Sequence, residues 1–368
     1  MTQSSPSAAP SKGIIDGYLV LTLLLCIFAV SPLFYPGYFQ THASFIPIWS
    51  INRLRENLFD LAWLPVLEPF NPWRSGGLLP YYVAALMPLS TLNAVKLISL
   101  IGVLAGASGL YLWLKSWVGA QGATVAALVY TYAPFTITTL YVRGSWSEAF
   151  FWGFLPWALL AATYLVAQPK LPIVIIGILF WSALGMCQLG LTVWAFVFLV
   201  VMQVIFHRPQ ALWPIISAAI GLGIASGLTF ARLNQALGPS EYSYSDHLVY
   251  PSQLLSAYFG LGLSQPGWDD GLSFSLGLAA IGLTILTFII WGGGPDRRPW
   301  FFASLAFFCA LVSSQLGSWF WLIPGLQGRG MEADAYYVLR EMARSFEIVP
   351  ITDDFDRLPD DVDVLLLA

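Results

Sequence analysis

Arg143 and Glu148 are the two residues whose types and spacing point most directly to chemistry. They lie five residues apart in the turn YVRGSWSE (141–148), between two apolar segments of membrane-spanning length. A charge at membrane depth costs about 2.5–3.5 kcal/mol on insertion scales, so such a residue faces a partner, a cavity or a ligand. Two interpretations stay open: the residues pair to pin one interhelical turn, or they line a polar site at the membrane surface.

The chemistry that these two side chains offer is phosphate binding and proton transfer. A guanidinium matches phosphate oxygens with two parallel N–H bonds, and a carboxylate can accept the proton of a hydroxyl. Arg143 is therefore the phosphate-side candidate and Glu148 the candidate base. Weaker phosphate candidates are Arg53, Arg55 and Arg74, because basic residues on amphipathic helices more often meet lipid headgroups.

Further candidates lie in the long connections. Asp60 and Glu68 could serve as a base, with Asp60 also a candidate for contact with a substrate, or they could be ordinary solvated loop carboxylates. Asp269 and Asp270 could line the same site or cap the following helix. His42 is a candidate catalytic residue. A metal site of His42 with the pair 246–247 (Asp-His) has no ligand spacing to support it, so no cofactor is expected and a divalent metal remains an alternative.

Bulk composition predicts the elements that must position these residues. Hydrophobic residues make up 57% of the 368 and charged residues only 10%, with a mean hydropathy of +0.71. A soluble domain is about 25% charged, so we expect an all-α polytopic membrane protein. The segment 1–13 reads as a disordered N-terminus, 14–325 as the transmembrane domain, and 326–368 as an acidic α/β tail that suggests a truncated or fused gene product.

The apolar pattern predicts nine spans, at 14–35, 94–114, 121–140, 149–167, 171–187, 189–206, 210–232, 271–291 and 300–322. Two amphipathic stretches, 44–59 and 78–90, read as interfacial helices within a large loop at 36–93. Small residues one turn apart, at Gly102/Gly106 and Gly223/Gly227, indicate close helix packing.

The basic residues of the loops predict orientation. With the N-terminus in the cytoplasm, the short cytoplasmic connections receive Lys12, Lys115, Lys170, Arg208, Arg297 and Arg298. The 36–93 loop, the 141–148 turn, the 233–270 loop and the tail then share the outer side. Their convergence on one face is the main functional prediction.

A family resemblance rests on GYFQTH (37–42), WLPVLEPFNPW (63–73), LLPYYVAALMPL (78–89), YAPFTITTLYVRGSWSE (132–148) and GWDDGLSFSLG (267–277). In this order they resemble bacterial membrane proteins of the GT-C glycosyltransferase superfamily, in the group labelled as a membrane domain related to 6-pyruvoyl-tetrahydropterin synthase. The resemblance implies a bacterial plasma-membrane protein that moves a sugar from a polyprenyl-phosphate carrier to an unknown acceptor. The tail is faintly similar to the extracytoplasmic domain of gliding-motility-type ABC transport proteins.

The sequence departs from the family pattern at the expected base. Ala43 stands where relatives carry a carboxylate, Pro47 where they carry a second histidine, and Gln188 where they tend to show histidine. We therefore expect slow or absent transfer. The alternatives are an inactive relative that binds a lipid-linked glycan or assists a partner, and a transporter. The outer loops carry no basic stripe of the kind that binds nucleic acid, so no nucleic-acid partner is expected.

Overall fold

The computed structural model describes residues 16–43, 45–58, 77–207, 212–233, 248–257, 260–262, 271–291, 297–314 and 316. These residues are mostly helical, and β-structure among them is confined to two isolated bridges, Val249–Ser314 and Leu261–Leu272. The all-α prediction is confirmed for this part of the chain. The tail at 326–368 and the N-terminal segment 1–13 lie outside the described residues.

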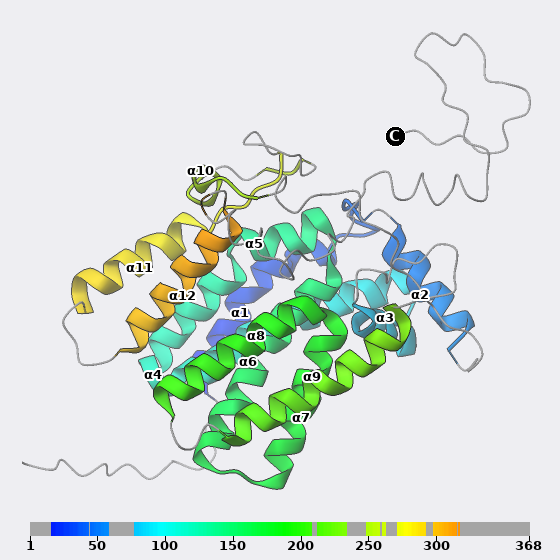
Figure 1. Ribbon diagram of the computed structural model, residues 1–368. Coiled ribbons are helices and arrows are strands. Elements are labelled where there is room, and N and C mark those ends of the chain that lie inside the picture. The colour runs from blue at the N-terminus through cyan, green and yellow to red at the C-terminus, as the bar shows by residue number, and fades with distance from the viewer. Residues whose placement is uncertain are drawn as a thin grey trace, which may run out of the picture.

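Apolar helices dominate the architecture (Figure 1). Four helical segments are long and apolar enough to cross a membrane: Gly17–Phe34 (α1, Gly17–Val30, with the 3-10 turn η1, Ser31–Phe34), α4 (Thr91–Thr131), α6 (Trp146–Ala167) and α8 (Leu189–Phe206). The shorter apolar helices are α7 (Leu171–Cys187), α9 (Leu212–Leu233), α11 (Leu278–Trp291) and α12 (Arg298–Ser313). The chain is thus a helical protein with membrane-spanning segments.

Helix α4 is two antiparallel legs, 91–118 and 120–131, that join at Gly119. Gly119 has φ 74° and ψ 173°, a conformation that glycine adopts without strain. Near the turn, Tyr111 packs with Ala127, and farther along a Cβ on Gly106 would lie 3.2 Å from the Tyr130 ring. The predicted spans at 94–114 and 121–140 are therefore separate legs.

Glycines bring the first leg of α4 close to α6, as the sequence predicted for Gly102 and Gly106. A Cβ added to Gly153 of α6 would lie 2.5 Å from the carbonyl oxygen of Gly102. The same expectation is wrong for Gly223 and Gly227, because no described atom lies within 4 Å of a Cβ built at either position. Those two residues face outward on α9, so the spacing alone did not identify a contact.

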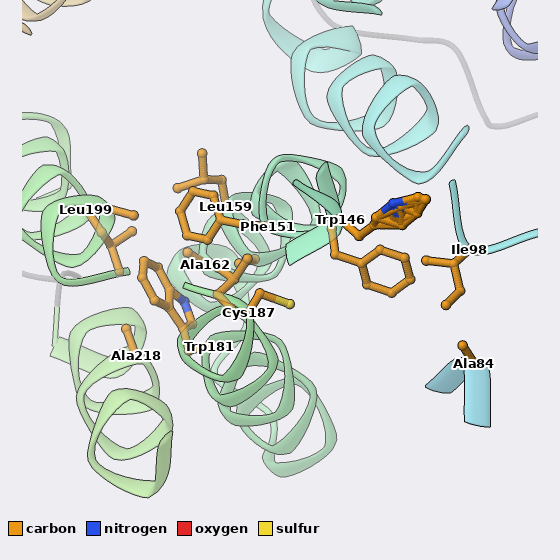
Figure 2. Packing of buried hydrophobic residues seen from close by; sticks show 14 of the residues in the cluster. Ala84, Ile98, Trp146, Phe151, Leu159, Ala162, Trp181, Cys187, Leu199 and Ala218 are labelled. Atoms are coloured by element: carbon orange, nitrogen blue, oxygen red, sulfur yellow. The ribbon is translucent and has the colours of Figure 1, made fainter. Parts of the chain in front are cut away.

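The core is continuous through α6 (Figure 2). Figure 2 shows Trp146 of α6 near Ile98 on one side, while Phe151 and Leu159 of α6 lie toward Trp181 and Leu199 on the other. The buried cluster joins α2, α3, α4, α6, α7, α8 and α9, and it excludes the polar connections from the middle of the bundle. Its large aromatic side chains hold the start of α6 firmly.

The two predicted amphipathic stretches form short helices, α2 (Ile46–Glu56) and α3 (Leu78–Leu86), and their place at a membrane interface stays a prediction. Nine residues of α3 cover only about 13 Å, too little to span a bilayer of about 30 Å. The expected span at 121–140 is interrupted: α4 ends at Thr131, and Pro134 begins a new turn, α5 (Pro134–Ile137), followed by the π-helix η3 (Thr138–Arg143). Proline has no N–H to continue the first helix.

Several connections meet at the end of the bundle where η3 lies. The short helix α10 (Pro251–Leu254) and α5 lie near one another there in Figure 1. A Cβ on Gly277 would lie 2.8 Å from Pro134 of α5, which places the 271–277 segment against this end. At the opposite end, Asp16 caps α1 and its carboxylate contacts Lys115 at 2.7 Å. The described parts of the 36–93, 141–148 and 233–270 connections therefore meet at one end of the bundle, as predicted, and the side of the membrane that this end faces stays a prediction.

Candidate functional site

Arg143 and Glu148 form a bidentate ion pair. Arg143 Nη1 donates to Glu148 Oε2 at 2.6 Å and Nη2 donates to Oε1 at 2.9 Å. The glutamate side chain is 16% exposed and the arginine side chain 36%. The pairing interpretation is therefore confirmed, and the guanidinium is the more accessible half of the pair.

The π-helix η3 places Arg143 opposite Glu148. Thr139 O accepts the N–H groups of both Gly144 and Ser145, and the latter bond is 3.0 Å long. Gly144 follows with φ 69°, and a Cβ there would lie 2.3 Å from Thr41 Oγ1, so a side chain is excluded on two counts. Single π-helical turns occur frequently at functional sites.

The first connection pairs directly with this turn. His42 N–H donates to Val142 O at 2.7 Å, and Ala43 N–H donates to Arg143 O at 3.2 Å. Ala43, where the family pattern carries a carboxylate, thus lies on the backbone that holds Arg143. An aspartate at position 43 would join the Arg143–Glu148 neighbourhood.

Aromatic rings anchor the same connection. Phe39 stacks on Trp146 with centroids 6.4 Å apart and meets the Tyr141 ring edge-on at 5.5 Å. The neighbouring Tyr38 stacks on Phe45 at 5.4 Å, and burial raises the pKa of Tyr38 above its ordinary value. These contacts fix the 38–43 segment against η3 and the start of α6.

The His42 imidazole turns to another connection. Its Nε2 lies 3.2 Å from Leu261 O, and the side chain is exposed. Leu261 belongs to the 233–270 connection, so this contact joins that connection to the 36–93 connection. The His42 backbone thus lies beside the turn that carries Arg143, whereas the His42 ring contacts Leu261.

The other predicted site residues, Asp60, Asp269 and Asp270, lie outside the described residues, as do Glu68 and Arg74. So do residues 246–247, which were the remaining members of the candidate metal site. In the described part of the chain, no three His, Cys, Asp or Glu residues gather as a metal site would require.

Arg55 has a structural role that the sequence did not predict. Its guanidinium donates to four carbonyl oxygens at the end of α3 and to the Thr91 hydroxyl. These bonds engage all three of its nitrogen atoms, so the guanidinium of Arg55 holds helix ends together in this structure. The exposed Arg53 pairs with Glu56 at 3.1 Å.

A small cavity beside η3 contains the least expected polar groups. Its lining includes Gly102, Gly106 and Gly153 together with Thr139 and Trp152. The Thr139 hydroxyl and the Trp152 indole N–H are buried without a hydrogen-bond partner among the described residues. An unsatisfied buried group costs about 1–3 kcal/mol, and sequence pattern alone gives no signal for it.

Comparisons with known proteins add no assignment. No family model, no curated protein and no solved structure matches this chain. The geometry of the Arg143–Glu148 site is therefore the guide to function.

Proposed function

We propose that this chain is a nine-span membrane protein of GT-C type that binds the phosphate of a polyprenyl-linked sugar at the outer face. The observation that carries the proposal is the bidentate Arg143–Glu148 pair, at the end of an apolar bundle where three connections meet. The lipid tail would lie in the bilayer and the phosphate at the guanidinium.

Arg143 retains donors for such a ligand. A guanidinium has five N–H groups, and two of them go to Glu148. Within the described residues no other acceptor contacts it, which leaves three N–H groups for phosphate oxygens. Its 36% exposure makes the guanidinium accessible from outside the bundle.

Glu148 is better suited to orient Arg143 than to act as a base. Both of its carboxylate oxygens accept hydrogen bonds from the guanidinium, so proton abstraction would first require the pair to open. Ala43 supplies no carboxylate in its place. Both observations favour a binding protein with slow or absent transferase turnover.

The binding assay uses purified protein in nanodiscs and a polyprenyl phosphate, with and without an attached sugar. Arg143→Ala should weaken binding about ten- to a hundredfold, because a charge-assisted hydrogen bond contributes about 1.5–3 kcal/mol. Arg143→Lys should recover part of the affinity, since a point charge lacks the planar fork. Arg53→Ala is the matched control. Equal affinity in Arg143→Ala and the natural protein would refute the phosphate role.

Turnover is a separate measurement. Ala43→Asp should raise sugar transfer if only the base is missing, since Ala43 donates its N–H to Arg143 O and lies beside the pair. Robust transfer by the natural protein that survives Glu148→Gln would instead show that catalysis uses another base.

Orientation has its own test. The positive-inside pattern places Lys115 and Lys170 in the cytoplasm and the η3 turn outside. Ser145→Cys should react with an impermeant thiol reagent on intact cells. Labelling only after lysis would place this turn, and with it the proposed site, on the cytoplasmic side.

A further inference from the structure

The short helix α3 is held at both of its ends by side chains from elsewhere in the chain. At its start, Ser147 Oγ donates to Gly77 O at 3.0 Å in a buried contact between residues 70 positions apart. Gly77 has φ 89°, and a Cβ there would lie 1.8 Å from Ser147 Oγ and 3.1 Å from Cys187 O. The start of α3 is thus seated on the start of α6 and on the break between α7 and α8.

The end of α3 is held by a single arginine. Arg55 Nη2 donates to the carbonyl oxygens of Leu89 at 2.8 Å, Met87 at 3.0 Å and Ala84 at 3.3 Å. Its Nε donates to Ala85 O at 3.3 Å. The last carbonyl groups of a helix have no partner within the helix, and here the guanidinium of α2 supplies the donors.

The start of α6 receives one further restraint from the start of α3, beside its aromatic packing in the core. Ser145 is the N-cap residue, yet its side chain makes no capping hydrogen bond in the described structure. Ser147 and Glu148 occupy the first turn of α6, so the Ser147–Gly77 bond restrains the same turn that carries the Glu148 carboxylate. Glu148 in turn orients Arg143.

We infer that α3 and the residues flanking it, 77–89 in all, hold the Arg143–Glu148 pair in its bidentate geometry. We call this segment the strap. Ser147 and Arg55 are then positioning residues of the phosphate site. The expected effect of the strap on phosphate binding rests on the proposed function. Its expected effect on the geometry of the pair rests on the hydrogen bonds alone.

Hydrogen exchange tests the geometric part without a ligand. Ser147→Ala should accelerate amide exchange in the peptide 138–150, which contains η3 and the pair. Ser182→Ala is the matched control, because its buried hydroxyl also donates to a carbonyl of another helix, Gly221 O at 3.2 Å, away from α3. Equal acceleration of that peptide in both variants, or none in Ser147→Ala, would overturn the inference.

Glycine substitutions separate the contact from backbone strain. Gly77→Ala and Gly37→Ala both place alanine at a φ near 90°, but no described atom lies within 4 Å of a Cβ on Gly37. Gly77→Ala should therefore loosen the 138–150 peptide and Gly37→Ala should not. Adding Ser147→Gly to Gly77→Ala should restore exchange to the level of Ser147→Gly alone. Failure of this rescue would show that the strap does not act through Ser147.

A variant at Arg55, which holds the end of the strap away from Ser147, is the most demanding test. Arg55→Lys keeps the charge but not the fork, so it should increase exchange in 138–150 although Arg55 contacts neither member of the pair. If Arg55→Lys loosens only α2 and α3, the helix does not transmit the restraint and the inference is wrong.

Binding completes the experiment. Ser147→Ala should weaken polyprenyl-phosphate binding about two- to tenfold, the fold-change expected for one hydrogen bond. Its effect should vanish in an Arg143→Ala background, because a positioning residue acts through the group that it positions. An undiminished effect there would contradict the inference. If the natural protein binds no phosphate while exchange still responds to Ser147→Ala, the proposed function fails and the strap stands.

Discussion

The energy of the Arg143–Glu148 pair can be worked out from its geometry. It has two charge-assisted bonds of 2.6 and 2.9 Å, with side chains 36% and 16% exposed. Fully exposed pairs contribute about 0.2–1 kcal/mol, whereas removal of one partner of a buried pair costs about 3–5 kcal/mol. The partial burial places this pair between those limits, and we expect a coupling energy of about 1.5–2.5 kcal/mol.

A double-mutant cycle measures this coupling. The free energy of unfolding is compared among the natural protein, Arg143→Ala, Glu148→Ala and the double variant, by reversible titration with a denaturing detergent in mixed micelles. Arg143→Ala should cost more than Glu148→Ala, because it leaves the more deeply buried charge without a partner.

The control cycle uses Arg53 and Glu56. This pair has one contact of 3.1 Å and side chains that are 38% and 64% exposed, so its coupling should be about 0.2–0.5 kcal/mol. A coupling of Arg143 with Glu148 no larger than this control would refute the assignment of a rigid bidentate pair. It would also remove the basis for treating Glu148 as the residue that orients Arg143.

Three further predictions concern the bundle. Gly153→Ala should lower the free energy of unfolding by about 1–3 kcal/mol in the same titration, since its Cβ would lie 2.5 Å from the backbone of α4. Gly223→Ala should be neutral or stabilising, because no described atom lies within 4 Å of its Cβ. Equal losses of stability in the two variants would contradict this. Thr139→Val should not lower the melting temperature, because the hydroxyl that it removes is buried without a partner in the described structure, and a clear loss would reveal one. Hydrogen bonding to Lys115 lowers the pKa of Asp16, so the ionised carboxylate stabilises the folded protein fully above the unfolded pKa of about 3.9, and this stabilisation is lost as the pH falls through the lower pKa of the folded state. Acidification should therefore bring the melting temperature of the natural protein toward that of Asp16→Asn. A difference between the two melting temperatures that stays constant with pH would contradict this.

Local patterns in the sequence predicted the elements well. The polar break at Cys187–Gln188 separates α7 from α8 as expected, and the amphipathic stretches became α2 and α3. Both follow from hydropathy and from the length that a bilayer requires. The pairing of Arg143 with Glu148 was one of two stated interpretations, because five residues across a turn bring the side chains within reach.

Contacts between distant segments could not be predicted in the same way. The start of α3 has no local signal for Ser147, and Met87-Pro88 at its end shows only that some donor must satisfy its carbonyl groups. That Arg55 is this donor depends on how α2 packs. The failure at Gly223 has the same origin, since small residues permit close packing but do not specify which face meets a neighbour.

Charges at the edge of an apolar bundle must be compensated, and three groups of described residues illustrate different ways of doing so. Asp16 caps α1 and accepts one hydrogen bond from Lys115, so the two charges join α1 to α4 at one end of the bundle. Arg55 spends its donors on helix carbonyl groups. Arg143 differs, because Glu148 occupies two of its five N–H groups and no other described acceptor contacts it. A cation that is partly exposed and only partly satisfied suits an anionic ligand, and for this reason we propose the phosphate site at Arg143 rather than at Arg55 or Lys115.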